Sequence, residues 1–496
     1  MLSLSIIIYI FIISFKNLKP LQLNRINILI LIYSSILTLQ IIIWGYDMLK
    51  LGIEIYGGLI QISIITIIAQ FILLICGIMI ITLGEWKNNE KQSLSVPAEY
   101  NLIILISILG MISLLSSNDL VSLFLSIELQ SFPLYILASF YKFNKKGYIN
   151  GIGINKDNQS SIAAGLKYLY LGALSSSFLL LGSAIIYGYT GLTNLGDIAL
   201  LININTDNLV INTIDLSYKL IPGFILIGIA LLFKIGAVPF HNWAPDVYDG
   251  VPTIVTSWIS IIPKISLVIF ISILYKGILK YNIMGWNYLL LLSSFGSLLI
   301  GSLLGLIQYR IKRLLSYSTI SHLGFILLGL GIENTNDIGS TYFYLIQYIL
   351  TSINIFMIIM SLNKFISIET ISQLKGQLIK NPILSIILAI NIFSLAGIPP
   401  FIGFFAKLYI LFDAIDGGYY FLAFIAILNS VISGGIYLRL IKIIQFDKFI
   451  ENNSNNPNTI KLNESTSSII SIITLFIITY IFYSQPIFYF LNQLYI

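Results

Sequence analysis

The sequence predicts an all-α polytopic membrane protein of about fourteen transmembrane helices, built around two inverted five-helix repeats. Hydrophobic residues make up 57% of the 496 residues, charged residues only 10%, and the mean hydropathy is +0.92, values that exclude a soluble globular protein. The apolar residues form unbroken runs, such as residues 60–81, rather than the two-residue alternation of a membrane β-barrel. One helical span takes about 20 apolar residues, so fourteen spans use roughly 280 residues and leave the remainder for connections.

The helices are placed between polar or Gly/Pro/Asn breaks. They lie near residues 1–15, 26–46, 57–83, 101–117, 119–142, 161–189, 220–240, 252–278, 284–307, 314–332, 339–364, 382–412, 419–444 and 467–492. In chain order they make a three-helix segment (1–100), a first repeat of helices 4 to 8 (101–280), a second repeat of helices 9 to 13 (281–446), and a polar loop with a last helix (447–496).

Basic residues support this helix count. Loops after odd-numbered helices contain 19 of the 27 lysines and arginines, whereas loops after even-numbered helices contain 4. Positive residues collect on one side of a membrane, so the basic loops face the matrix or cytoplasm and both termini face the opposite side. This topology also accounts for the net charge of +6 without a nucleic-acid partner. The four remaining basic residues fall inside helices: Lys167, Lys234, Lys264 and Lys407.

Buried charges mark the candidate functional residues. A charged side chain at the centre of a spanning helix costs about 2.5–3.5 kcal/mol and is usually retained for function. Glu128 is the one carboxylate that we place deep in the membrane, and its expected depth matches that of Lys234 and Lys264. A lysine that gains and loses a carboxylate partner in a dry environment alternately holds and releases a proton. These residues therefore predict a proton relay; the alternative is a buried ion pair that only fixes helix packing.

Three further residues have weaker claims. Lys167 lies about two turns inside its helix, and its four-carbon stem can extend the ammonium to the basic face of the membrane. A role in the proton path and a purely structural role at that face are therefore equally open. His241 and His322 are the only histidines. Each could carry protons near neutral pH or simply fill a packing position.

Two helices are predicted to be broken in the middle. The strings FKIGAVPFHNWAP (residues 233–245) and SLAGIPPFIGFFAK (residues 394–407) interrupt apolar runs with glycine and proline, and each contains a buried lysine, Lys234 or Lys407. Unwound backbone at membrane depth is tolerated where it is buried in protein or lines a wet cavity, as in many transporters. The two strings lie five helices apart, and this odd separation predicts opposite orientations and hence inverted repeats.

Redox and nucleotide chemistry are excluded for this chain alone. A single cysteine, Cys76, cannot form an internal disulfide or supply the roughly four ligands of an iron–sulfur cluster. Two histidines cannot build a multi-histidine metal site. The Gly-x-Gly strings at Gly151 and Gly329 follow no strand, so no dinucleotide-binding fingerprint is present.

The chain resembles the antiporter-like membrane subunits of respiratory complex I. The resemblance rests on LLFKIGAVPFHNWAPDVYDGVPT followed by IIPK, on KRLLSYSTISHLGF, and on LAGIPPFIGFFAK, and it covers helices 4 to 13. The chain lacks the long lateral helix typical of the chain 5 type, and Lys407 stands where the chain 4 type has a glutamate.

The resemblance implies a function and a set of partners. It implies a proton path through Glu128, Lys234, Lys264 and Lys407, with Lys167 and His241 at subsidiary positions, driven by quinone reduction elsewhere in the complex. NADH, FMN, iron–sulfur clusters and ubiquinone are then expected in partner subunits of the membrane and peripheral arms, and phospholipids around this chain. The expected location is the mitochondrial inner membrane, with termini on the intermembrane-space side and basic loops in the matrix. A subunit of a multisubunit cation/proton antiporter and a structural membrane scaffold remain the rival readings.

Overall fold

The structure is a computed structural model. It describes residues 2–15, 20–83, 99–139, 152–207, 214–275, 277, 284–332, 338–363, 368–447, 464–484 and 486. These residues are mostly helical, in eighteen α-helices with one two-stranded hairpin, and nine of the helices are long and apolar enough to cross a membrane. The prediction of a polytopic all-α membrane protein is confirmed at this level.

The chain divides into two compact units, each described by itself below. The first unit comprises Met1–Gly236 and Gly250–Leu289, and the second comprises Ala237–Asp249 and Leu290–Ile496. The helix α11 (Met284–Ile307) is shared between the two, and α9 (Trp243–Gly250) belongs to the second unit except for its last residue.

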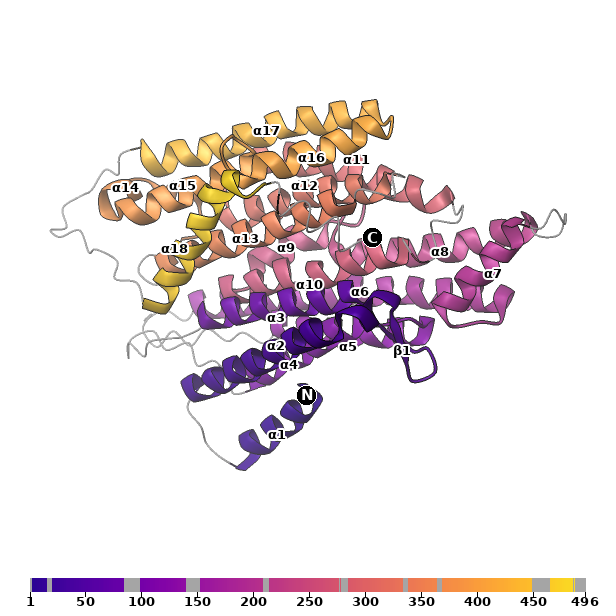
Figure 1. The fold of residues 1–496 in the computed structure, drawn as a ribbon. Helices are drawn as coiled ribbons and strands as arrows, with labels where there is room; N and C mark the ends of the chain where they lie inside the picture. Colours follow the sequence, from indigo (N-terminus) through magenta and orange to yellow (C-terminus); the bar gives the residue numbers. More distant parts are fainter. Residues whose placement is uncertain are drawn as a thin grey trace. The chain divides into compact units, whose positions relative to one another are not determined.

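The first unit is a helix bundle that closes around α10. Its elements are α1 (Leu2–Phe15), α2 (Pro20–Leu51), β1 (Ile53–Ile55), β2 (Ile60–Ile62), α3 (Ile64–Leu83), α4 (Glu99–Leu115), α5 (Leu120–Ser139), α6 (Ile152–Thr190), α7 (Leu195–Asp207), α8 (Ile214–Ile235) and α10 (Thr253–Leu274). Among them α2 packs on α3, α4 on α5, and α6 on both α5 and α8 (Figure 1). Because α10 contacts α3, α4, α5 and α8, nearly all of its side chains are buried, and it forms the core.

The second unit surrounds α12 and α13 in the same way. Beyond α9 and α11 it contains α12 (Ile311–Gly331), α13 (Ile338–Asn363), η2 (Ile371–Leu374), α14 (Gln377–Lys380), α15 (Pro382–Ala396), α16 (Ile402–Asp416), α17 (Tyr420–Gln445), α18 (Glu464–Thr479) and η3 (Tyr480–Phe482). α13 packs against α12, α15, α16 and α18, and the yellow helix α18 crosses it obliquely in Figure 1.

Both expected helix breaks are present. α8 ends at Ile235, and α15 ends at Ala396. Gly236 and Gly397, the residues that follow, have φ angles of 81° and 83°, a left-handed conformation that favours glycine. A cis peptide bond comes next in each break, at Val238–Pro239 and at Pro399–Pro400. The two breaks therefore share one backbone pattern as well as one sequence pattern.

The structure also contains elements that the sequence reading missed. α7 and the β1–β2 hairpin were expected to be loop or part of a span, and α6 begins at Ile152 rather than near 161. α7 has only 13 residues, and the first turns of α6 are polar (INKDNQSS), so neither produces a long apolar run. Most of the polar loop expected after residue 447, and most of the last helix beyond residue 482, lie outside the described residues.

Loops of like parity meet at common faces within each unit. In the first unit the hairpin after α2 bonds to the turn after α4 (Gln61 N–H to Ser116 O, 2.8 Å), and that turn bonds to the loop after α6 (Leu120 N–H to Thr193 O, 3.0 Å). In the second unit Ile311 N–H donates to Glu369 O at 3.1 Å, joining the loops on either side of α12 and α13. When successive helices alternate in direction, every second loop lies on the same side of the bundle. These loop–loop hydrogen bonds fit that arrangement.

Candidate proton-carrying sites

The first unit brings Glu128 and Lys234 together. Glu128 comes from α5 and Lys234 from the last turn of α8, and Lys234 Nζ lies 3.9 Å from Glu128 Oε1. Their side chains are 15% and 7% exposed. At about 4 Å and an effective dielectric constant near 20, such a pair attracts by about 4 kcal/mol. The two charges therefore interact strongly although they are not in hydrogen-bond contact.

Tyr135 stands at the same ammonium group. Lys234 Nζ donates a hydrogen bond to Tyr135 Oη at 2.8 Å, shorter than its distance to the carboxylate. Within the described residues Glu128 Oε1 accepts no hydrogen bond, so the ion pair is stretched and the phenol holds the lysine. The lysine thus has two alternative partners, a charged one and a neutral one.

Packing fixes the position of Tyr135. Its ring meets that of Tyr168 on α6 edge-on, with centroids 4.7 Å apart. Its hydroxyl lies directly over Gly172, one turn further along α6, where a Cβ atom would overlap it. Tyr135 was not singled out from the sequence, although it follows Glu128 by seven residues and therefore shares a face of α5 with it.

Lys264 occupies the buried interior of α10 and is 5% exposed. Thr253, Ser257 and Ser260 precede it at spacings that place all four residues on one helix face. Ser266 Oγ donates to Gln130 Oε1 at 3.3 Å, and these residues lie two positions after Lys264 and Glu128. The bond shows that α5 and α10 pack against each other within two residues of Glu128 and of Lys264.

In the second unit Lys407 is bound to the broken helix. It lies on α16, is 6% exposed, and donates from Nζ to the carbonyl of Ala396, the last residue of α15, at 2.8 Å. Carbonyls at a helix C-terminus lack intrahelical donors and attract cations. Gly397 and Ile398 N–H groups bond the carbonyls of Phe393 and Ser394, and the ammonium satisfies that of Ala396.

Gly397 gives the Lys407 stem room to reach this carbonyl. A Cβ atom at Gly397 would lie 2.9 Å from Lys407 Cδ and 3.3 Å from Nζ. The glycine therefore serves two purposes, a left-handed turn and a close approach. Lys234 likewise lies on the last turn of α8, so each half-helix that precedes a break has an ammonium at its C-terminal end.

His322 lies in a tyrosine cluster close to Lys407. It is 3% exposed on α12, with Nδ1 2.7 Å from Tyr344 Oη and Nε2 3.2 Å from Tyr437 Oη. The Phe325 ring stacks on Tyr344 with centroids 5.6 Å apart, and Lys407 Nζ lies 5.5 Å from the Phe325 centroid. One aromatic ring thus separates the lysine from the histidine cluster.

The other two sequence-predicted residues are Lys167 and His241. Lys167 is exposed on α6, one residue before the buried Tyr168. His241 is 7% exposed in the segment between the first break and α9, and within the described part of the chain its Nδ1 has no hydrogen-bond partner.

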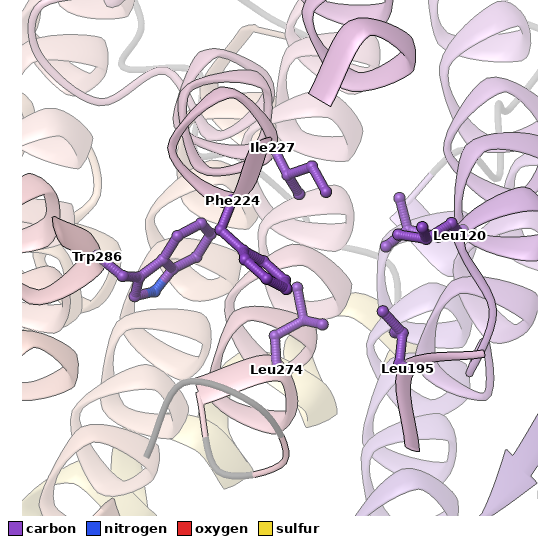
Figure 2. Close-up of a pocket in the computed structure, with 7 residues that line it drawn as sticks. Leu120, Leu195, Phe224, Ile227, Leu274 and Trp286 are labelled. Carbon is purple, nitrogen blue, oxygen red and sulfur yellow. The ribbon is translucent and has the colours of Figure 1, made fainter. Parts of the chain in front are cut away.

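The first unit also has a small apolar hollow. It is lined by Leu120, Leu123, Leu195, Phe224, Ile227, Leu274 and Trp286. Figure 2 shows Phe224, Leu274 and Trp286 on one side of it and Leu120 and Leu195 on the other. The side chains that line it are all uncharged.

These features define a class: polytopic helical membrane proteins in which broken helices carry buried lysines. A family model described as the transmembrane region of NADH:quinone oxidoreductase and Mrp antiporters matches residues 117–433, more than half of the chain. The chain belongs to this family. The match covers Glu128, Lys234, Lys264 and Lys407.

Individual relatives agree. The chain is 42% identical to NADH-ubiquinone oxidoreductase chain 2 of Rhizopus oryzae over 95% of its own length and 94% of that protein. Its fold is similar to a chain of respiratory complex I from Thermus thermophilus (TM-score 0.75, 23% identity, 98% and 97% covered). It is also similar to a chain of the Mrp complex from Dietzia sp. (TM-score 0.80, 17% identity, 100% and 95% covered). The similarity to the Rhizopus oryzae protein confirms the resemblance to the membrane subunits of complex I.

Proposed function

We propose that this chain is a proton-translocating membrane-arm subunit of NADH:ubiquinone oxidoreductase, acting in the mitochondrial inner membrane. Its similarity to NADH-ubiquinone oxidoreductase chain 2 over nearly its whole length supports the complex, and the stretched Glu128–Lys234 pair supports the transport role. Iron–sulfur clusters belong to partner subunits in this proposal, because this chain has only one cysteine, and NADH, FMN and ubiquinone are assigned to partner subunits on the similarity alone.

The first unit supplies a switch. When Glu128 approaches Lys234, the ammonium form is stabilised; when the carboxylate moves away, the buried lysine releases its proton, with Tyr135 as its remaining neutral partner. Quinone reduction elsewhere in the complex drives this change. Lys264, on the neighbouring helix α10, receives the proton in this scheme.

Lys407 acts in the second unit. It holds its proton at the Ala396 carbonyl and passes it on when the ammonium leaves that position. Lys167, His241 and His322 are subsidiary members of the path. Of these, His322 has the strongest structural support, because it lies one ring away from Lys407.

The full topology is also part of the proposal. The described residues contain nine long apolar helices, four shorter apolar helices and the 22-residue helix α8, which together give fourteen spans. In this count α15 is one of the four shorter helices, and α16 is the second half of the same broken span. Ion pairs support the expectation that loops after odd-numbered spans lie on one side of the membrane. Arg310 and Arg313, which follow span 9, bond Asp249 at 2.6 and 3.0 Å, and Asp249 follows span 7. The left-handed glycine that ends each half-helix, together with the separation of the two breaks by five spans, supports inverted repeats of helices 4 to 8 and 9 to 13, and this topology would place the basic loops in the matrix.

Replacing Glu128 with glutamine tests the switch. The amide keeps the size and polarity of the side chain but removes the charge that changes the proton affinity of Lys234. Proton pumping per NADH oxidised, measured with the complex in sealed vesicles, should fall by about a hundredfold, the scale of a lost acid–base group. Normal pumping by an assembled Glu128→Gln complex would contradict the switch.

Gly172→Ala tests the position of Tyr135. The added methyl group overlaps the Tyr135 hydroxyl, so the phenol has to leave Lys234, with an overpacking cost of about 1–3 kcal/mol. Pumping should fall while the charged residues all remain. Gly188→Ala is the matched control on the same helix, because a Cβ there meets nothing within 4 Å. Equal pumping by the two variants would show that the phenol contact is dispensable.

The rival reading is a subunit of a cation/proton antiporter, which the fold similarity to the Mrp chain makes worth testing. Purification of the native complex in mild detergent separates the two. We expect the particle that contains this chain to oxidise NADH and to show flavin and iron–sulfur signals. A particle without NADH oxidation, flavin or iron–sulfur signals would favour the antiporter. The lysine path would then still be a candidate, but quinone reduction would not be its source of energy.

A further inference from the structure

The two halves of the broken helix in the second unit touch each other through their backbones. α15 ends at Ala396 and α16 begins at Ile402, so Gly403 is the second residue of α16. A Cβ atom built on Gly403 would overlap the carbonyl oxygen of Ser394, which lies in the last turn of α15. The side-chain nitrogen of Gln347, on α13, lies 3.1 Å from the same Cβ position. Only glycine therefore fits at residue 403 while the helices stay where they are.

Gly403 and Lys407 lie on one face of α16. Residues four apart in a helix are neighbours on its surface, with about 6 Å of rise between them. Long side chains in helices also point back toward the N-terminus of their own helix. Lys407 follows this rule, because its Nζ reaches the carbonyl of Ala396, beside the end of α16 that Gly403 holds against α15.

A side-chain movement cannot relieve the overlap at Gly403. The atom in the way is a backbone oxygen, and this oxygen also accepts a hydrogen bond from the Gly397 N–H group at 3.1 Å, within the turn that ends α15. A methyl group at residue 403 therefore has to push α16 away from α15. Lys407 would move with α16, away from the carbonyl that its ammonium satisfies.

The lysine stem has little room to compensate for such a movement. Lys407 is 6% exposed, its Cδ lies 2.9 Å from the Cβ position of Gly397, and its Nζ lies 5.5 Å from the centroid of the Phe325 ring. The position of the ammonium is therefore set by where α16 stands relative to α15.

We propose that Gly403 is a positioning residue, which sets the distance between Lys407 and the open carbonyl at the end of α15. It does so by having no side chain, so that the two half-helices meet backbone to backbone. In the proposed relay the ammonium then leaves Ala396 by rotation within its own side chain, while the joint at Gly403 keeps α16 in place. This inference rests on the proposed function and adds the residue that positions its carrier in the second unit.

Gly403→Ala in the whole complex tests the joint. We expect proton pumping in sealed vesicles to fall at least about tenfold, the kinetic equivalent of a lost hydrogen bond to a charged group. Gly434→Ala is the matched control, because it makes the same change within α17, a helix of the same unit, where a Cβ meets nothing within 4 Å. The control should pump normally.

Two further measurements separate positioning from packing. The ratio of pumping rates in H₂O and D₂O should rise in Gly403→Ala, because proton transfer at the displaced Lys407 becomes the slow step, whereas a loss of correctly packed complex lowers both rates equally. In a complex that already carries Lys407→Gln, Gly403→Ala should cost little more, since changes that act through one group are not additive. Normal pumping by Gly403→Ala, an unchanged isotope ratio, or a loss that multiplies in full with that of Lys407→Gln would each overturn the proposal.

Gly397→Ala keeps the proposal testable if Gly403→Ala prevents assembly. This change acts on the same distance from the other side of the break, because its Cβ meets Lys407 Cδ and displaces the stem instead of the helix. An assembled Gly397→Ala complex should pump more slowly and show the raised isotope ratio. Normal pumping and a normal ratio would overturn the proposal.

The Lys407→Ala result tells this failure apart from failure of the proposed function. If Lys407→Ala stops pumping and Gly403→Ala does not, the positioning role of Gly403 is wrong and the relay stands. If neither variant affects pumping, the role of Lys407 in transport is itself wrong.

Discussion

Replacing Lys234 with alanine should abolish most proton pumping while the complex still assembles. The variant removes the group that takes up the proton in the proposed relay and leaves the buried Glu128 carboxylate without its cation. We expect a loss of about a hundredfold in pumping, comparable with loss of a general acid or base. The measurement is acidification of vesicles during NADH oxidation, with assembly followed on native gels.

Arginine at the same position distinguishes a relay from a structural ion pair. Lys234→Arg preserves the positive charge opposite Glu128, but a guanidinium does not release its proton in proteins. A packing role predicts that arginine restores pumping, whereas the relay predicts that it does not. Lys219→Ala, an exposed lysine on the same helix, should pump normally. Full pumping by Lys234→Ala would end the relay hypothesis.

Replacing Lys407 with alanine should give the second large effect. The ammonium satisfies the carbonyl at the end of α15, so its loss removes the proton carrier of the proposed relay and leaves a buried acceptor unpaired, at a cost of about 1–3 kcal/mol. Pumping should fall by about a hundredfold, again on the scale of a lost acid–base group.

Lys375→Ala provides the control for this second variant. Lys375 forms a half-exposed ion pair with Asp447 at 3.7 Å, and such pairs contribute little. Lys407→Gln adds information, because an amide can still donate to Ala396 but cannot carry a proton. Equal and normal pumping by Lys407→Gln and the unaltered chain would show that Lys407 only supports the helix break.

The class of fold and the main charged residues could be predicted from the sequence because membrane insertion penalises charge so strongly. Each lysine within an apolar run has to be offset, so Lys234, Lys264 and Lys407 stand out without any alignment. The breaks were predictable for a similar reason, since proline and glycine interrupt a helix whatever surrounds it. The roles of these residues stay predictions for the variants above to test.

The neutral partners could not be predicted so directly. The chain has 30 tyrosines, and tyrosine is common in membrane proteins as an anchor at the interface. Only helix packing decides that Tyr135 meets Lys234 or that Tyr437 meets His322. For Tyr135 the seven-residue spacing from Glu128 was a usable indication. For Tyr437, 115 positions from His322 in the chain, the sequence offers none.

The bond between Lys407 and Ala396 connects a buried ammonium group to the backbone of a broken helix. When the ammonium withdraws, the exposed carbonyl needs another donor, and a water molecule is the smallest one that fits this role. When the ammonium returns, that water has to leave. If Lys407 moves as the proposed relay requires, the break would alternate between a wet and a dry state, and one side chain would control both the proton and the access of water to this point of the membrane.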